Sequence, residues 1–323
     1  MSEKIVVLDM MAEARAEQVR ALVPSGMRFS WGSAPGDEAM KALIADADYA
    51  IAGQVAVSGD VLRAAKKLKL LHKWGVGVDN LDLEAARACG IKVARTTGSN
   101  AVPVAEFALG LTLASLRGIS FGNAELKQGR WRGLSGLPMQ TFLLSGKTFG
   151  IVGFGAIGKT VARIIRGFGC TVLYNKRTPL TPAEEAEHGA TYATIDELLA
   201  RSDVVSLNCP LTPETKNLIN KTTLQRMKRT AVLVNVARGG VVAEDDLVWA
   251  LKNGVIHSAA MDVYEIEPLP PDSPLLQPID NLTVTPHLAA IAVDVFASSV
   301  QQMMHNILCV SRGEPVPERD AVV

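Results

Sequence analysis

Four ionisable side chains in the last third of the chain could transfer protons and bind a carboxylate. Arg238, Glu265, Glu267 and His287 each follow a short apolar stretch. Histidine gives and takes protons near neutral pH, and a neighbouring carboxylate favours the imidazolium and orients the ring. Arginine has a planar fork that matches a carboxylate and can polarise a nearby carbonyl. These are the residue types needed for acid–base chemistry on an organic acid.

A glycine-rich turn precedes these side chains. The run Gly153-Phe154-Gly155-Ala156-Ile157-Gly158 lies between an apolar stretch and a helical pattern. In such a unit the first glycine permits a tight turn, the second lets a pyrophosphate approach the backbone, and the third lets helix and strand pack closely. A turn without a ligand is the alternative, but the flanking pattern favours a dinucleotide. A nicotinamide beside Arg238 and His287 predicts hydride transfer between a 2-oxo acid and a 2-hydroxy acid.

The residues after the next apolar strand indicate which dinucleotide binds. An acidic residue that accepts hydrogen bonds from the ribose is usual there. This chain has Asn175, Lys176 and Arg177 instead. A 2′-phosphate is repelled by a carboxylate and held by lysine and arginine. We therefore expect NADP(H) to be preferred, with NAD(H) possible; the alternative is that both cations are solvated and Asn175 binds the ribose.

A second glycine-containing loop occurs earlier, in the run Lys73-Trp74-Gly75-Val76-Gly77-Val78-Asp79-Asn80. Two glycines so close together leave backbone N–H groups available to line an anion site. The loop could hold the substrate carboxylate opposite Arg238. A tight turn without a ligand is the alternative.

Short apolar strands alternate with helical patterns along the whole chain, which predicts two doubly wound parallel α/β units. The strands of the first unit are expected at 5–8, 28–31, 49–52, 69–73 and 92–94, with helices at 12–22, 37–45, 59–65 and 83–88. The strands of the second unit are expected at 149–152, 171–174, 204–207, 231–236, 259–263 and 282–285. Since ligands bind beyond the carboxyl ends of parallel strands, Arg238, the two glutamates and His287 should meet at the edge that holds the glycine turn. Each could serve structure alone, but their coincidence at one edge favours chemistry.

Two further stretches bear on domain organisation. Residues 101–116 form a long helical pattern, and 293–310 form another that could return to the first unit. Between 121 and 145 the sequence is irregular and rich in glycine, which is long for a connection within a compact domain. We expect this segment to be an arm that packs on a second subunit.

The composition excludes several classes of function. The 323 residues are 48% hydrophobic and 20% charged, as in a globular protein. Lysine plus arginine balance aspartate plus glutamate at 33 each, so no overall field favours nucleic acid or an anionic membrane. No apolar run reaches the length of a membrane span, and no metal-ligand spacing is present. The four cysteines lack close spacing, which is typical of reduced thiols in a cytoplasmic protein.

Several short motifs follow one another along the chain in a specific order. They are Gly75-Val76-Gly77-Val78-Asp79-Asn80, Asn100 with Val104-Ala105-Glu106, the glycine turn, Cys209-Pro210-Leu211-Thr212-Pro213-Glu214-Thr215, Asn235-Val236-Ala237-Arg238-Gly239, Asp262-Val263-Tyr264-Glu265-Ile266-Glu267-Pro268 and Thr285-Pro286-His287. Over nearly its whole length the chain thereby resembles the D-isomer-specific 2-hydroxyacid dehydrogenases. The resemblance implies a Rossmann cofactor domain at 101–292, with a dimerisation arm at about 121–145. It also implies a discontinuous flavodoxin-like substrate domain at 1–100 and 293–323, and a homodimer.

The resemblance also implies roles for individual residues. Arg238 would anchor the substrate carboxylate, Glu267 rather than Glu265 would partner the histidine, and His287 would be the acid and base. Val76 and Gly77 would offer backbone N–H groups to the substrate. The cofactor contacts would come from Gly153, Gly155, Ala156, Ile157, Gly158, Asn175, Lys176, Arg177, Cys209, Pro210, Thr215, Val236, Ala237, Asp262 and His287, with Asp262 and the backbone near Ala237 holding the nicotinamide carboxamide.

Departures from the family pattern bear on which cofactor and which substrate we expect. Asn175 replaces the frequent ribose-binding aspartate, as in glyoxylate and hydroxypyruvate reductases that use NADP. No regulatory domain follows the last helix, which argues against a long-form phosphoglycerate dehydrogenase. A non-enzymatic scaffold that senses the cofactor is the alternative from another class. Oxidation of formate or phosphite is disfavoured because Pro286, rather than an amide side chain, precedes the histidine.

Overall fold

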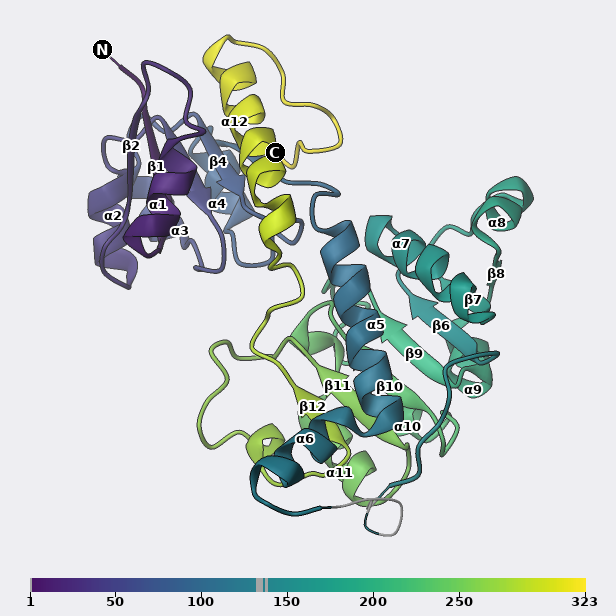
Figure 1. Ribbon diagram of the computed structural model, residues 1–323. Helices are drawn as coiled ribbons and strands as arrows, with labels where there is room; N and C mark the ends of the chain where they lie inside the picture. Colours follow the sequence, from purple (N-terminus) through teal and green to yellow (C-terminus); the bar gives the residue numbers. More distant parts are fainter. Residues whose placement is uncertain (1, 132–135, 137–138) are drawn as a thin grey trace. The chain divides into compact units, whose positions relative to one another are not determined.

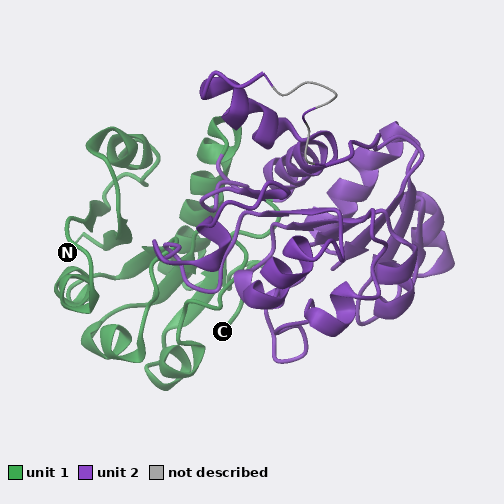
Figure 2. Ribbon diagram, turned by 90° about the horizontal axis from the view of Figure 1, so that it is seen from below, with its two compact units in different colours: residues 1–100, 292–323 green, residues 101–291 purple. Residues whose placement is uncertain are grey.

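The computed structural model describes residues 2–131, 136 and 139–323, and the chain divides into two compact units (Figures 1 and 2). Unit 1 comprises residues 1–100 and 292–323, and unit 2 comprises 101–291. The division lies one residue before the boundary expected from the sequence, because Ala292 groups with unit 1. The predicted arm at 121–145 lies partly outside the described residues.

Unit 1 contains a five-stranded parallel sheet in the order β2-β1-β3-β4-β5, which is the flavodoxin-like order. Its strands are β1 (Lys4–Met10), β2 (Arg28–Gly32), β3 (Tyr49–Ala52), β4 (Leu70–Lys73) and β5 (Lys92–Arg95). Its helices are α1 (Glu13–Arg20), α2 (Asp37–Ile44), α3 (Gly59–Ala64), α4 (Leu83–Ala88) and α12 (Phe296–Ser311). Alternate residues of β1 enter two different apolar clusters, so both faces of the sheet are covered.

The helix predicted at 293–310 begins as a 3₁₀ turn at Val293–Val295 and continues as α12. A buried polar network joins it to the sheet. His72 Nδ1 lies 2.9 Å from the Lys73 carbonyl oxygen, and the amide of Asn306 lies 3.0 Å from Nε2 and donates to Asp320 at 3.1 Å. Burial lowers the pKa of His72 to about 4, so the ring is neutral and its protonated nitrogen is Nδ1. These contacts explain why α12 belongs to a unit that begins at the other end of the sequence.

Unit 2 contains a seven-stranded parallel sheet in the order β12-β11-β10-β9-β6-β7-β8. Its strands are β6 (Thr148–Val152), β7 (Thr171–Asn175), β8 (Ala190–Tyr192), β9 (Val204–Leu207), β10 (Val232–Asn235), β11 (Ser258–Met261) and β12 (Leu282–Val284). Its helices are α5 (Ala101–Arg117), α6 (Ile119–Lys127), α7 (Ala156–Ile165), α8 (Pro182–His188), α9 (Ile195–Arg201), α10 (Lys221–Leu224) and α11 (Glu244–Lys252). The strand order reverses at β6, as in the Rossmann fold.

In unit 2 one prediction was wrong in part, and one strand was not predicted. The irregular arm predicted from residue 121 includes helix α6, because left-handed Gly118 (φ 62°) ends α5 and a new helix starts at once. Gly122 inside α6 suggested a loop, but a helix tolerates a single glycine. Strand β8 was not predicted, since it has three residues at the edge of the sheet.

Helix α5 runs along one face of the unit 2 sheet and contacts β10, β11 and β12 (Figure 1). Among the described residues no single helix is long and apolar enough to span a membrane. Taken together α5 and α6 have the required length and composition, but they are bent by 68° at the break between them. The apolar side of α5 is buried within the core of unit 2.

Candidate active site

The carboxyl ends of three neighbouring strands bring the predicted chemical residues together. Asn235 of β10 pairs with Met261 of β11, and Met261 pairs with Val284 of β12, so these strands end at one level. The turns that follow carry Arg238, Glu267 and His287. The sequence-based expectation that these side chains share one edge of the unit 2 sheet agrees with the strand order and register.

The imidazole of His287 and the carboxylate of Glu267 are hydrogen-bonded, with 2.7 Å between Nδ1 and Oε2. Both side chains are about one-third exposed, at 30% and 32%. The other oxygen of Glu267 accepts a hydrogen bond from the Tyr264 backbone N–H at 2.9 Å. Partial burial acts to raise the pKa of Glu267, but the hydrogen bonds from His287 and Tyr264 outweigh it, and the pKa is lowered. Glu267 is therefore ionised at neutral pH, and within the described part of the chain nothing bonds to the His287 Nε2 atom.

The loop that carries His287 is held by the buried carboxylate of Asp262. One oxygen accepts hydrogen bonds from the Thr285 hydroxyl at 2.6 Å and the Leu288 N–H at 2.9 Å, and the other accepts from the Ala289 N–H at 2.9 Å. His287 itself has a left-handed backbone (φ 52°), which is uncommon for a residue other than glycine. Asp262 was expected to contact the nicotinamide, and in the structure its two oxygens serve this loop.

The turn after β10 positions Arg238. The amide of buried Asn235 donates to the Arg238 carbonyl oxygen at 2.9 Å and accepts from the Ala237 N–H at 3.1 Å. A Cβ atom on Gly239 would lie 1.8 Å from the carbonyl carbon of Tyr264, so only glycine lets the two turns meet. The Arg238 charge also contributes to the lowered pKa of Glu267. The hydrogen bonds of Asn235 to this turn were not predicted from the sequence, although a buried polar residue at the end of an apolar strand is a signal for such contacts.

The glycine turn has the geometry that a dinucleotide requires. Gly153 (φ 92°) would carry a Cβ 2.6 Å from the backbone of Asn208, and a Cβ on Gly158 would lie 2.3 Å from the Gly153 carbonyl oxygen. Close packing therefore demands both glycines. No atom lies within 4 Å of a Cβ on Gly155, which precedes the first residue of α7, Ala156. This open position at a helix N-terminus fits the approach of a pyrophosphate.

The cations expected to select the cofactor follow β7. The amide of Asn175 donates to the Ala193 carbonyl oxygen at 2.9 Å, so this side chain is already anchored to the protein. Lys176 is half-buried and Arg177 is exposed. Neither makes an ion pair with another described residue, although their charges contribute to the lowered pKa values of the carboxylates of Glu184 and Glu214, respectively.

The loop after β9 contains three of the expected cofactor residues. Thr215 donates from its hydroxyl to the Pro210 carbonyl oxygen at 2.7 Å, which closes the loop, and Cys209 is buried. Burial raises the pKa of Cys209 to about 11, so this thiol is not a nucleophile at neutral pH. Asn208 was not predicted to be a site residue. Its amide oxygen is buried beside the glycine turn and has no partner within the described residues.

The loop after β4 lies on the corresponding edge of the unit 1 sheet. Gly75 has φ 136°, and its carbonyl oxygen accepts a hydrogen bond from the Thr96 N–H at 3.0 Å. The backbone N–H groups of Val76 and Gly77 make no hydrogen bond to any residue that the structure describes, as an anion-binding loop requires. These two residues belong to unit 1, whereas Arg238, Glu267 and His287 belong to unit 2.

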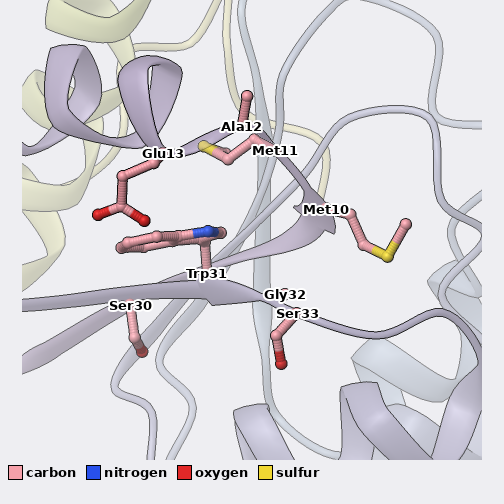
Figure 3. Close-up of a pocket in the computed structure, with 8 residues that line it drawn as sticks. All are labelled: Met10, Met11, Ala12, Glu13, Ser30, Trp31, Gly32 and Ser33. Carbon is pink, nitrogen blue, oxygen red and sulfur yellow. The ribbon is translucent and has the colours of Figure 1, made fainter.

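A pocket of about 710 Å³ lies on the same edge of unit 1, where β1 and β2 end (Figure 3). In the close-up the Glu13 carboxylate lies above the Trp31 indole, and the Met10 side chain points away from it. The pocket is lined by Met10, Met11, Ala12, Glu13, Ser30, Trp31, Gly32 and Ser33. None of the predicted site residues is among them. Elsewhere in the described ranges, no three His, Cys, Asp or Glu side chains are grouped so as to hold a metal ion.

The fold and this edge define a nicotinamide-dependent oxidoreductase of the doubly wound α/β class. The family model described as "D-isomer specific 2-hydroxyacid dehydrogenase, NAD binding domain" matches residues 109–289. The chain belongs to the D-isomer specific 2-hydroxyacid dehydrogenase family.

Individual relatives support this assignment. The chain is 38% identical to a glyoxylate reductase of Korarchaeum cryptofilum over 81% of its own length and 78% of that protein. It is also 38% identical to a D-3-phosphoglycerate dehydrogenase of Archaeoglobus fulgidus, over 84% of this chain but only half of that longer relative. Among solved structures, an NAD-dependent formate dehydrogenase from Staphylococcus aureus in complex with NAD is 30% identical, with a TM-score of 0.87 over 99% of both chains. All three are named as enzymes, which argues against the alternative of a non-enzymatic scaffold.

Proposed function

We propose that the chain reduces a small 2-oxo acid of the glyoxylate or hydroxypyruvate type to the D-2-hydroxy acid, with NADPH as the preferred cofactor. The observation that carries this proposal is the 2.7 Å hydrogen bond between His287 and Glu267, at the edge of the sheet that also presents Arg238 and the glycine turn. A proton donor, its orienting carboxylate and a carboxylate anchor suit reduction of a carbonyl next to a carboxylate.

In this proposal each residue has one task. Arg238 binds the substrate carboxylate through its planar guanidinium fork. His287 donates the proton from Nε2 to the carbonyl oxygen as that oxygen gains negative charge, and it takes the proton back in the reverse reaction. Glu267 stabilises the imidazolium and orients the ring through Nδ1. A bound nicotinamide would supply a hydride, which carries two electrons and one hydrogen nucleus; with the proton from His287 this converts the carbonyl group to the secondary alcohol.

The preference for NADPH rests on the residues after β7. Lys176 and Arg177 offer two positive charges where a carboxylate would bind the ribose of NAD. Because Asn175 is anchored to Ala193, the two cations are the residues proposed to bind the 2′-phosphate. The formate dehydrogenase structure holds NAD, so the proposed preference for NADPH rests on Lys176 and Arg177 of this chain and not on that similar protein.

A side-by-side assay tests the proposal. Oxidation of NADPH and NADH is followed with glyoxylate, hydroxypyruvate, pyruvate and phenylpyruvate, and formate with NADP or NAD is the reverse control. We expect turnover of the small oxo acids, with a lower KM for NADPH than for NADH. Lys176→Ala and Arg177→Ala should raise the KM for NADPH and leave that for NADH unchanged. Oxidation of formate without reduction of any oxo acid would contradict the proposed substrate class.

We also propose that the working form is a cytoplasmic homodimer formed through unit 2. The described part of the predicted arm and its flanks carries apolar side chains that are at least half exposed: Ile119, Leu126, Trp131 and Leu143. Exposed apolar residues gathered in one segment are typical of a surface that another chain covers. Light scattering during gel filtration should give twice the chain mass of 34.4 kDa. A monomer at micromolar concentration would contradict this part of the proposal.

A further inference from the structure

Glu244, the first residue of α11, is a charged group beside the catalytic pair that the proposed reaction does not use. Its carboxylate accepts a hydrogen bond from the backbone N–H of Glu265 at 2.8 Å. Glu265 lies two residues before Glu267 in the turn that follows β11. A side chain from a different element therefore holds the turn that carries the partner of His287.

The turn 264–267 is held by a hydrogen bond within the turn, by the Tyr264 hydroxyl, which lies within hydrogen-bond distance of the Met261 and Thr285 carbonyl oxygens, and by Glu244. Glu267 accepts a hydrogen bond from the Tyr264 N–H at 2.9 Å, which closes the turn on itself. The Tyr264 hydroxyl donates to the Thr285 carbonyl oxygen at 2.9 Å, which joins the turn to the loop of His287. Glu244 provides the remaining contact, and it comes from the element that follows the Arg238 turn. The hydrogen bond from Glu265 to Glu244 thus links the Arg238 side of the site to the Glu267 side.

The charge at this position works against the stability of the fold. Partial burial raises the pKa of Glu244, and the carboxylates of Glu265, Asp245 and Glu267 raise it further. The hydrogen bond from Glu265 lowers it, but the net direction is upward. An acid whose pKa is higher in the folded state stabilises the fold only while protonated, and that contribution is lost as the pH rises through the folded value. A negative charge on Glu244 therefore lowers the stability of the fold, so stability alone does not explain this residue.

We propose that Glu244 is a positioning residue for the reaction, acting through Glu267. By accepting the hydrogen bond from the Glu265 N–H, it holds the turn at the place where the Glu267 carboxylate meets the His287 ring. The inference rests on the proposed function, since it concerns the efficiency of the same His287–Glu267 pair. Glu244 itself is not required to touch the substrate or the cofactor.

Three variants separate this role from a structural one. Glu244→Ala removes the acceptor, and Glu244→Gln keeps an amide oxygen at the same place without the charge. Asp246→Ala is the matched control, because Asp246 lies in the same first turn of α11 and accepts a hydrogen bond from the Lys221 N–H at 2.9 Å, away from the catalytic pair. We expect Glu244→Ala to lower kcat about 10-fold with the KM for NADPH unchanged. Glu244→Gln should stay within about threefold of the parent, and Asp246→Ala should leave kcat unchanged.

A double variant tests whether Glu244 acts through Glu267. In the Glu267→Gln background the further change Glu244→Ala should cost little more, because the group that it positions is already lost. Independent, multiplicative losses would overturn the proposal, as would a Glu244→Gln variant as slow as Glu244→Ala.

Amide hydrogen exchange gives a readout that does not depend on turnover. Exchange in residues 264–267 should be faster in Glu244→Ala than in the parent, and unchanged there in Asp246→Ala. Unaltered exchange in Glu244→Ala would overturn the positioning role even if no 2-oxo acid were reduced. Absence of turnover by the parent protein would contradict the proposed function instead, so the two failures are distinguishable.

Discussion

The two units share an architecture but use the edges of their sheets differently. In unit 1 the charged groups at the edge are bonded to neighbouring loops: Asp9 accepts hydrogen bonds from the N–H groups of residues 53–55, and buried Lys73 donates to Asn80 at 2.8 Å. In unit 2 the side chains of Glu267 and His287 bond to one another and remain about one-third exposed. The polar residues of unit 1 hold neighbouring loops in place, whereas those of unit 2 leave two ionisable groups partly exposed.

This difference shows how one kind of sheet can supply two kinds of site. A backbone anion site needs rigid loops and free N–H groups, and internal hydrogen bonds provide that rigidity. Proton transfer needs side chains with a pKa in the working range and access to the substrate. Substitutions at the unit 2 edge should therefore affect turnover first, and substitutions within unit 1 should affect stability or binding first.

The largest effect is expected for His287→Ala. Removal of the proton donor should lower kcat by about 10³-fold, while the affinity for NADPH changes little because the proton transfer takes no part in cofactor binding. Steady-state kinetics with fluorescence titration of NADPH gives both values. Equal losses in kcat and in cofactor affinity would show that His287 holds the cofactor rather than the proton.

A paired glycine substitution tests the contact between the two catalytic turns. Gly239→Ala would place a Cβ 1.8 Å from the Tyr264 carbonyl carbon and should destabilise unit 2 by about 3 kcal/mol. Gly240→Ala is the matched control, since its Cβ would meet only the Leu211 side chain at 3.4 Å. Urea unfolding should show the loss in the first variant and a change below about 1 kcal/mol in the second. Equal stability of both would mean that the turns can separate at little cost.

Arg238→Lys tests the carboxylate anchor. Lysine keeps the charge but loses the planar fork, so the KM for the oxo acid should rise by about 100-fold with a smaller change in kcat. Kinetics over a range of oxo acid concentrations measures both. An unchanged KM would place the carboxylate elsewhere and shift weight to the Val76–Gly77 loop.

A pH experiment addresses unit 1. Burial lowers the pKa of His72 from 6.5 to about 4, so the folded state resists protonation. The contribution of neutral, buried His72 to the free energy of unfolding is complete above pH 6.5 and is lost as the pH falls toward 4. Between pH 7 and pH 5 the loss should be about 2 kcal/mol. The pKa of Asp320 is lowered, so its contribution is lost only at more acidic pH and does not mask the effect.

Denaturant unfolding measures this loss when it is followed by tryptophan fluorescence in a Trp131→Phe, Trp249→Phe background, which retains Trp31 and Trp74, both in unit 1. His72→Gln should reduce the difference between pH 7 and pH 5. Exposed His305, on the same helix as Asn306, provides the control, and His305→Gln should retain the full difference. A pH dependence unchanged by His72→Gln would assign the acid sensitivity to another group.

Most of the fold could be predicted because buried parallel strands read as continuous apolar runs with turn residues between them. The predicted strands of both units agree with the structure to within a few residues at each end. Strand β8 escaped prediction because three residues carry too little pattern, and α6 escaped because Gly118 and Gly122 resemble a loop. Both elements depend on their neighbours more than on their own composition.

The candidate site, like the fold, could be predicted from the sequence only in part. Arg238, the two glutamates Glu265 and Glu267, and His287 could be located because they lie in the turns that follow strands, whereas the choice of Glu267 over Glu265 came from the resemblance to the family. The hydrogen bonds of Asp262 and Glu244 could not be predicted, because they join these side chains to backbone N–H groups that lie 26 and 21 residues away in sequence, respectively. The selection of cofactor by Lys176 and Arg177 stays a prediction, since it depends on contacts with a ligand.

The most direct test of the account follows the hydride itself. NADPH deuterated at the transferable C4 position is incubated with hydroxypyruvate or glyoxylate, and the product is analysed by mass spectrometry and, for hydroxypyruvate, by chiral chromatography. The account predicts one deuterium at the C2 carbon of the hydroxy acid, the D-isomer as the product, and loss of labelled product in His287→Ala. An unlabelled product, or the L-isomer, would contradict the assignment of hydride transfer to this edge of unit 2.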